Sequence, residues 1–353
     1  MNTTGGYPLP KFVNRAGLRR STATFLVIVA VTAGCSTNPL TAPPPTIEPA
    51  GPAASPPQVN RPAGEILPLS GNPQAAVFDR RTGSLAVFTP GPDPQSAATL
   101  TLFTSAGTPR ELALPGPATA LAGDGQGSAY LSTRGGYITV DLAAGTATPT
   151  SINDEADTDF TAIARRADGR LVLGSADGTA YTMGTETAVA EKVKMFARVD
   201  AVVTEGNNAV ILDRGQTSVT SLDSDGHIQQ ALRAGEGATT LAADPVGRVV
   251  VADTRGGQLL VFGVDPLIER QAYPVPDAPY GLAGSPNLTW VSQTTSNMVV
   301  GYDLTTGIPV EKVRYPTVQQ PNSLAFDDTS DTLYVVSAAG AGVQVIRNAA
   351  GAR

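Results

Sequence analysis

Few residues in this chain of 353 could carry out metal or nucleophilic chemistry. It has one cysteine, Cys35, and one histidine, His227. Most metal sites built from thiolate and imidazole ligands are therefore excluded, and any Ser-His-Asp or Cys-His catalysis would have to include His227. Oxygen ligands remain in the acidic run NDEADTD, where Asp154, Asp157 and Asp159 are candidate ligands of Ca²⁺. A solvated acidic loop is the alternative interpretation of this run.

Three arginines recur in similar short turns. Arg134 lies in STRGG, Arg214 in LDRGQ and Arg255 in DTRGG. If these turns share one face of the fold, their guanidinium groups could bind a carboxylate or a phosphate through paired hydrogen bonds. The alternative is that Arg-Gly is ordinary hairpin chemistry and that these side chains are solvated. The sequence thus predicts a candidate ligand face and leaves both interpretations open.

The charge of the chain is unevenly distributed. The formal net charge is −7, and four of the 24 basic residues, Lys11, Arg15, Arg19 and Arg20, precede Cys35. No acidic residue lies in that stretch. The remainder of the chain is therefore more acidic than the whole. Such a body lacks the basic surface that phosphate backbones require, which argues against nucleic acid as a partner.

The first 34 residues have the pattern of a sorting signal. Four cations in residues 11–20 precede a short uncharged apolar run at residues 22–33. About a dozen residues are too few for a transmembrane helix, which needs about 20, but they fit the apolar region of a secretory signal. Two small residues, Ala33 and Gly34, then lie directly before Cys35.

Residues 11–35 resemble the lipobox region of bacterial lipoproteins, although Thr32 departs from the aliphatic residue usual at its position. The resemblance implies that residues 1–34 are a signal peptide and that the Cys35 sulfur carries diacylglycerol, with palmitate-type acylation of the mature cysteine. The protein would then be anchored at the extracytoplasmic face of the cell membrane. An ordinary signal peptide with an incidental cysteine is the alternative. Residues 35–64 are rich in proline and predict a disordered tether after the lipidated Cys35.

From residue 65 onward, short apolar segments recur about every 40 residues, which is typical of β-propeller blades. Each repeat begins with a segment of small residues and continues with two apolar runs and a more polar one. We predict an all-β, seven-bladed propeller of four-stranded blades over residues 65–350, in which residues 65–70 (EILPLS) supply the outer strand of the last blade. Six or eight blades, or a solenoid, are the alternatives. The seven first segments are AAVFD (75–79), ALAGD (120–124), AIARR (162–166), AVVTE (201–205), TLAAD (240–244), GLAGS (281–285) and SLAFD (323–327).

The last two repeats, which begin PYGLAGSPNLTWVS and PNSLAFDDTSDTLYVVS, resemble the YVTN/NHL/lactonase-like class of propeller repeats. That class includes lactonases and binding scaffolds, so the resemblance implies a fold more than a function. With its signal, its proline-rich stretch and these repeats, the whole chain resembles the conserved lipoproteins of mycobacteria and related actinobacteria.

Two functions are consistent with these features. The first is a lipid-anchored, extracytoplasmic propeller that binds an envelope protein or a small ligand without catalysis and needs no cofactor. The alternative is a Ca²⁺-dependent hydrolase of the lactonase or gluconolactonase type that uses carboxylates in the central channel. The second predicts converging acidic side chains, whereas the first strands carry mainly Ala, Leu, Val and Gly.

Overall fold

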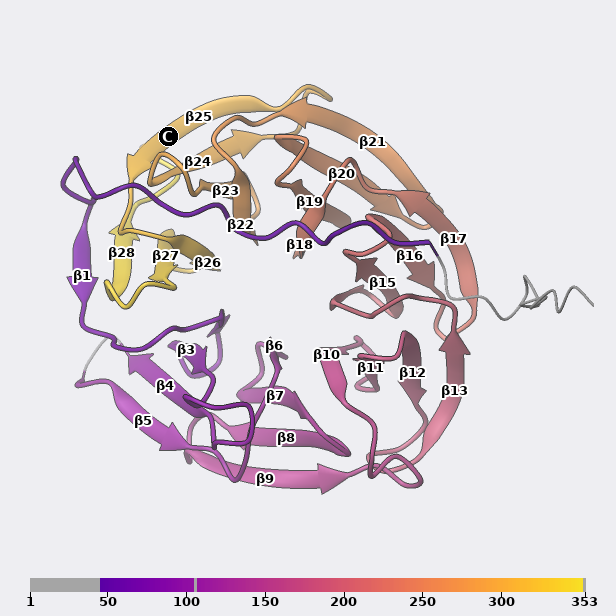
Figure 1. The fold of residues 1–353 in the computed structure, drawn as a ribbon. Helices are drawn as coiled ribbons and strands as arrows, with labels where there is room; N and C mark the ends of the chain where they lie inside the picture. The colour runs from indigo at the N-terminus through magenta and orange to yellow at the C-terminus, as the bar shows by residue number, and fades with distance from the viewer. Residues whose placement is uncertain (1–44, 105–106, 352–353) are drawn as a thin grey trace, which may run out of the picture. The chain divides into compact units, whose positions relative to one another are not determined.

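The described part of the chain folds as a ring of β-blades. A computed structural model describes residues 45–104 and 107–351. These residues form 28 strands in seven sheets of four strands each, and Figure 1 shows the sheets arranged in a ring around a central axis. Within the same residues, no helix is long and apolar enough to cross a membrane. The predicted seven-bladed propeller is confirmed.

Each blade is an antiparallel meander whose first strand lies nearest the channel. Blade 1 comprises β2 (Ala75–Asp79), β3 (Ser84–Thr89), β4 (Thr99–Thr104) and β5 (Arg110–Ala113); blade 2 comprises β6 (Ala120–Gly123), β7 (Ser128–Thr133), β8 (Gly136–Asp141) and β9 (Thr146–Ser151); blade 3 comprises β10 (Phe160–Arg165), β11 (Leu171–Ser175), β12 (Thr179–Met183) and β13 (Val189–Lys194).

The other four blades repeat this order. Blade 4 comprises β14 (Ala201–Glu205), β15 (Asn208–Asp213), β16 (Ser218–Leu222) and β17 (Ile228–Arg233); blade 5 comprises β18 (Ala238–Asp244), β19 (Arg248–Asp253), β20 (Gln258–Val264) and β21 (Leu267–Pro274); blade 6 comprises β22 (Pro279–Gly284), β23 (Thr289–Gln293), β24 (Met298–Asp303) and β25 (Val310–Pro316); blade 7 comprises β26 (Pro321–Asp327), β27 (Thr332–Ser337), β28 (Val343–Arg347) and β1 (Glu65–Leu67).

Radial packing explains the residue types along each blade. The two middle strands face neighbouring blades on both sides, so every residue of β11 and β12 is buried. The outer strand β13 faces water on one side, and its residues alternate between half-buried and exposed. The core is therefore a series of layers between blades; in one layer Phe88 and Leu100 of blade 1 pack with Leu131 and Ile138 of blade 2.

The ring closes by pairing its first strand with its last repeat. In β1, Glu65 pairs with Val345 and Leu67 pairs with Val343 of β28. The strand is shorter than the predicted 65–70, because it ends before Pro68, which has no N–H to donate. Gly64 enters this strand with φ of +73°, and a Cβ at this position would collide with the carbonyl oxygen of Val345. The seam therefore requires glycine there.

The residues before β1 lie along one face of the ring as an extended segment that we call the strap (residues 46–63). In Figure 1 the strap runs across the blades from the β16–β17 side to the start of β1. The N–H of Ile47 donates to the Gly215 carbonyl at 2.8 Å, and the N–H of Ala63 donates to the Pro316 carbonyl at 3.0 Å. The strap is thus held at both ends.

This docked strap differs from the disordered tether expected over residues 35–64. The proline content prevents the segment from forming its own core or a regular strand, as composition indicates. It does not prevent an extended chain from docking on another part of the protein, because the carbonyl groups of such a chain remain free to accept hydrogen bonds. Residues 35–44, including Cys35, lie outside the described residues.

Candidate functional site

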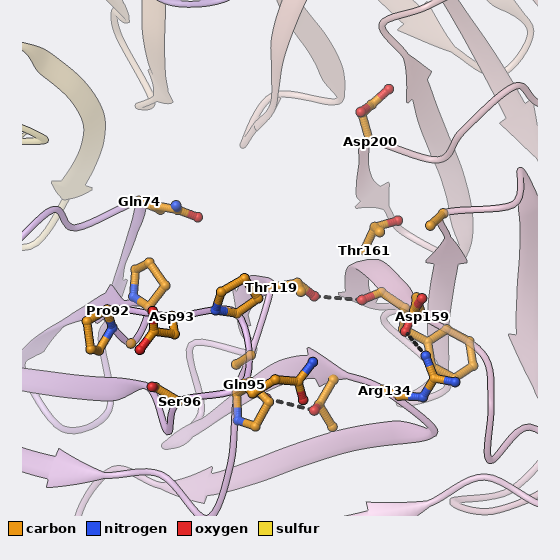
Figure 2. Close-up of a pocket in the computed structure, with 18 of the residues that line it drawn as sticks. Gln74, Pro92, Asp93, Gln95, Ser96, Thr119, Arg134, Asp159, Thr161 and Asp200 are labelled. Atoms are coloured by element: carbon orange, nitrogen blue, oxygen red, sulfur yellow. Dashed lines mark hydrogen bonds and ion pairs between the residues drawn. The ribbon is translucent and has the colours of Figure 1, made fainter.

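A pocket lies at the mouth of the central channel, on the face crossed by the strap. Its volume is about 910 Å³, which is near the upper end of common small-molecule sites. It is lined by the connections between second and third strands and by those between successive blades, mainly from blades 1 to 4. Figure 2 shows Gln74 and the Pro92–Ser96 loop on one side of it, with Asp159, Thr161 and Asp200 on the other. We call this cavity the mouth pocket.

One wall of the mouth pocket is an unusually long connection in blade 1. Nine residues, 90–98, join β3 to β4, whereas only Arg134 and Gly135 join β7 to β8. The long loop includes Pro90, Pro92 and Pro94, which restrict its backbone. A Cβ at Gly91 would clash with Ser96. The loop is therefore a tight, restrained wall.

The opposite wall carries an arginine–aspartate cluster. Arg134 Nη1 donates to Asp159 Oδ1 at 2.7 Å, and Arg134 Nη2 donates to Asp157 Oδ1 at 3.1 Å. Hydrogen bonds to Asp157 and Asp159 raise the pKa of Arg134. The structure thus joins two sequence features that seemed independent, the candidate ligand-face arginine and the candidate metal carboxylates.

These contacts leave the acidic run without a metal-binding geometry. Asp157 and Asp159 share the guanidinium of Arg134, and Asp154 is set off on a turn with φ of +62°. Burial raises the pKa of Glu155, but hydrogen bonds from Lys192 and Thr158 outweigh it and lower the pKa overall. Across residues 45–104 and 107–351, no group of three or more His, Cys, Asp or Glu side chains is arranged to hold a metal ion.

The other two arginines of the predicted ligand face hold the strap. Arg214, in the β15–β16 turn, donates through Nη2 to the carbonyl of Ala50. Arg255, in the β19–β20 turn, donates through Nη2 to the carbonyl of Glu48 at 2.6 Å. Arg214 also lines the mouth pocket. Of the three arginines, Arg134 is thus paired with aspartates, whereas Arg214 and Arg255 donate to backbone carbonyls of the strap.

Asp200 is a site residue that the sequence did not single out. It lies directly before β14, and its side chain is 11% exposed. Its Oδ2 accepts from the N–H of Arg214 at 2.8 Å, and its Oδ1 lies 3.3 Å from Arg198 Nε. Burial raises the pKa of Asp200 despite these partners. One sequence signal could have identified Asp200: it is a polar residue directly before the first strand of a blade. Gln74 and Thr119, which also line the pocket, have the same placement.

Threonine hydroxyls connect neighbouring blades around the channel mouth. Thr119 Oγ1 donates to the Phe160 carbonyl at 2.6 Å, from blade 2 to blade 3. Thr161 Oγ1 donates to the Val199 carbonyl at 2.5 Å, between blades 3 and 4. Thr240 makes the equivalent bond between blades 5 and 6. These bonds hold neighbouring inner strands together, and the first two involve residues that line the mouth pocket, Thr119, Phe160 and Thr161.

His227 lies outside the mouth pocket. It occupies the turn between β16 and the outer strand β17, and its side chain is 64% exposed. Its Nδ1 lies 3.8 Å from Asp223 Oδ2, and the Asp223 side chain also accepts from the N–H of His227 at 2.9 Å. The aspartate therefore shapes an exposed hairpin turn. His227 does not line the mouth pocket.

Comparison with solved structures shows the same fold in proteins of different function. A streptogramin B lyase superposes with a TM-score of 0.65 at 10% identity over 82% of this chain and 97% of that one. A catalytically inactive virginiamycin B lyase from Staphylococcus aureus with quinupristin gives 0.65 at 11% identity, over 80% and 97% of the two chains. Hydrazine synthase from Kuenenia stuttgartiensis gives 0.64 at 13%, over 79% and 96%.

At these identities the likeness extends to the fold alone. No protein-family profile matches the sequence, and no curated protein is significantly similar to it. The chain is therefore a seven-bladed propeller that resembles the lyase and hydrazine synthase propellers in architecture.

Proposed function

We propose that this protein is a non-catalytic binding protein of the cell envelope whose ligand occupies the mouth pocket. The observation that carries the proposal is a pocket of about 910 Å³ whose walls combine a restrained proline loop with hydrogen-bonding side chains. The charged groups are balanced, since Arg134 is paired with Asp159 and Arg198 with Asp200. Such a site suits a polar ligand of low net charge.

The placement of His227 and of the pocket carboxylates is our reason for proposing binding over catalysis. The inactive virginiamycin B lyase carries a histidine-to-alanine change, whereas the one histidine here is the exposed His227 of an outer turn. A lactonase-type hydrolase would need carboxylates that converge on Ca²⁺. The pocket residues Asp159 and Asp200 instead lie against arginines, so no observation favours that alternative.

The test of the pocket compares two pocket variants with a matched outer variant. Arg134→Ala and Asp200→Asn change the pocket wall, whereas Arg347→Ala removes a similar exposed ion pair, with Glu65, on the outer strands. We expect crosslinked envelope preparations to yield a specific partner or ligand with the wild type and the outer variant, and at least about tenfold less with the pocket variants. Equal recovery from all four proteins would contradict the assignment.

Catalysis is tested on the same proteins. Stoichiometric Ca²⁺ in the purified protein together with turnover of a lactone panel would replace binding with the hydrolase alternative. We expect neither, because the carboxylates of the acidic run are engaged by Arg134 and Lys192.

The envelope location rests on the N-terminal sequence. The cationic run, the short apolar run and Cys35 support a lipid anchor at the extracytoplasmic face of the membrane. Mass spectrometry of the mature protein should find an acylated cysteine as its first residue. A Cys35→Ser protein should leave the membrane fraction; if it stays there to the same extent as the wild type, the lipid anchor is wrong.

A further inference from the structure

The contacts that hold the strap have a common chemistry. Side chains of the blades donate hydrogen bonds to main-chain carbonyls of the strap: Arg255 to Glu48, and Arg214 to Ala50. Two amide side chains continue the series. Gln320 Nε2 donates to the Ala53 carbonyl at 3.0 Å, and Asn297 Nδ2 donates to the Pro56 carbonyl at 2.9 Å.

Three of these donors lie in the corresponding turn of successive blades, at different places within that turn. Arg214, Arg255 and Asn297 each lie in the turn between the second and third strands, in blades 4, 5 and 6. The donors therefore form a row across the face, and Figure 1 shows the strap crossing these blades. We call this row, with Gln320 from the connection into blade 7, the donor row. In blade 2 the equivalent turn carries Arg134, which binds acids instead.

A proline-rich chain is the natural complement of such a row. Proline has no N–H, and an extended polyproline-like chain leaves its carbonyls free to accept. The strap presents its proline rings mostly to solvent, as at Pro49, Pro52 and Pro56, and buries only the Ala50 side chain. Recognition thus depends on backbone carbonyls and an extended shape more than on particular side chains.

Ser55 is the principal exception and fixes the register of the strap. Its Oγ donates to the Thr294 carbonyl at 2.7 Å and accepts from the N–H of Gln320 at 3.0 Å. Its N–H donates to Gln320 Oε1 at 3.0 Å. A serine followed by two prolines, as in Ser55–Pro56–Pro57, is therefore the most specific element of the occupant.

We propose that the donor row is a binding site for an extended, proline-rich polypeptide segment with a serine before its prolines, and that the strap is the occupant supplied by the chain itself. A proline-rich segment of another protein is then a competitor for the same site. Because a short linker gives the strap an effective concentration in the millimolar range, the intact chain hides the site from dilute competitors. The donor row borders the mouth pocket, because Arg214 belongs to both, but its test uses the strap peptide and needs no pocket ligand.

The experiment releases the strap from the full chain after folding. A protease recognition sequence is inserted after Val59, whose side chain is highly exposed. Cleavage leaves Ala63 and β1 attached to the ring while it turns the strap into an exchangeable peptide. A fluorescent peptide of residues 45–59 is then added, and its anisotropy is measured with cut and uncut protein, with circular dichroism as the check of folding.

We expect the peptide to bind the cut protein at least about 100-fold more tightly than the uncut protein. Arg255→Ala should weaken binding by about tenfold or more, since it removes a charged donor. The matched control is Arg134→Ala, which changes the equivalent turn of blade 2 and should leave peptide binding unchanged. A peptide with Ser55 replaced by alanine should also bind more weakly.

Several results would overturn the proposal. Unfolding of the cut protein would mean that the strap belongs to the fold and is no exchangeable ligand. Failure of the folded, strap-free protein to bind the peptide would exclude the site, as would equal binding by Arg255→Ala and Arg134→Ala. Equal binding by cut and uncut protein would place the peptide elsewhere. Sedimentation of the uncut protein tests one more outcome. If it shows dimers in which each copy binds the strap of the other, the donor row binds a second copy of this chain, and the proposed partner is wrong.

Discussion

Replacement of Thr161 by valine tests whether hydroxyl bonds between blades hold the channel mouth together. Thr161 is 9% exposed and lies at a bulge in β10, between paired residues Phe160 and Ala162. Its hydroxyl donates to the Val199 carbonyl in the connection to blade 4, at 2.5 Å. Valine has nearly the same shape but no donor. The change therefore removes this hydrogen bond, together with the longer contact of the same hydroxyl with the Gly174 carbonyl at 3.3 Å.

The magnitude follows from leaving a buried carbonyl without its partner. An unsatisfied buried acceptor costs about 1–3 kcal/mol. Taking about 2 kcal/mol, the folded-to-unfolded ratio of Thr161→Val should fall by about thirtyfold at 25 °C. Thr161→Ser keeps the hydroxyl and loses one methyl group, so its cost should stay near or below about 1 kcal/mol.

Urea unfolding followed by tryptophan fluorescence measures this difference. The single tryptophan, Trp290, is fully buried in β23 of blade 6 and stacks on Phe326 of blade 7. It therefore reports unfolding on the far side of the ring from Thr161. If Thr161→Val unfolds within about 0.5 kcal/mol of the wild type, or if Thr161→Ser loses as much as Thr161→Val, the hydrogen bond does not have the proposed role.

Two further predictions concern pH and the seam. Burial raises the pKa of Asp177, but hydrogen bonds, chiefly from Lys194, lower it from 3.8 to about 2, so its ionised form stabilises the fold. Because Asp177 is 55% exposed, the contribution is under about 1 kcal/mol. It is present above about pH 4 and is lost as the pH falls through about 2. Urea titrations should therefore find Asp177→Asn less stable than the wild type at pH 6, with a difference that shrinks below about pH 4 and disappears below about pH 2; a difference that does not change with pH would contradict the lowered pKa. At the seam, Gly64→Ala should cost more than about 2 kcal/mol, because its Cβ collides with the Val345 carbonyl. The control is Gly83→Ala, at φ of +61° with no atom near its Cβ, which should cost only about 1 kcal/mol of backbone strain. Thermal melts compare the two variants, and equal melting shifts would show that the seam tolerates a side chain.

Much of the fold could be predicted because a propeller is encoded locally. Each blade repeats the same order of small, apolar, apolar and polar segments, since distance from the axis sets the burial of each strand. The leftover segment at residue 65 and the three-stranded last repeat each lacked a partner, so their pairing followed from the need to satisfy backbone groups. The pairing of Glu65 with Val345 confirms this reasoning.

The candidate site was much less predictable, because it depends on which turns of different blades meet. Arg134 and Asp157 are 23 positions apart in the sequence, and no periodic pattern pairs them. Asp200 belongs to the site because it contacts Arg198 and Arg214. Arg198 lies in the connection between β13 and β14, and Arg214 lies in the turn between β15 and β16. Side-chain partners at a loop face are set by three-dimensional proximity, which a strand pattern does not encode.

By itself the sequence predicted seven blades, their strand order and the closure of the ring. It could do so because the burial of a strand depends on its distance from the axis, and the residue types that this burial selects recur about every 40 residues. It also supplied the proline-rich composition of residues 46–63. Only the tertiary structure decided that this segment docks as a strap. Its proline content limits the secondary structure that the segment can form by itself, but it does not determine which donors its free carbonyl groups contact. Here they meet Arg214, Arg255, Asn297 and Gln320, donors that line up across one face only once the blades are assembled.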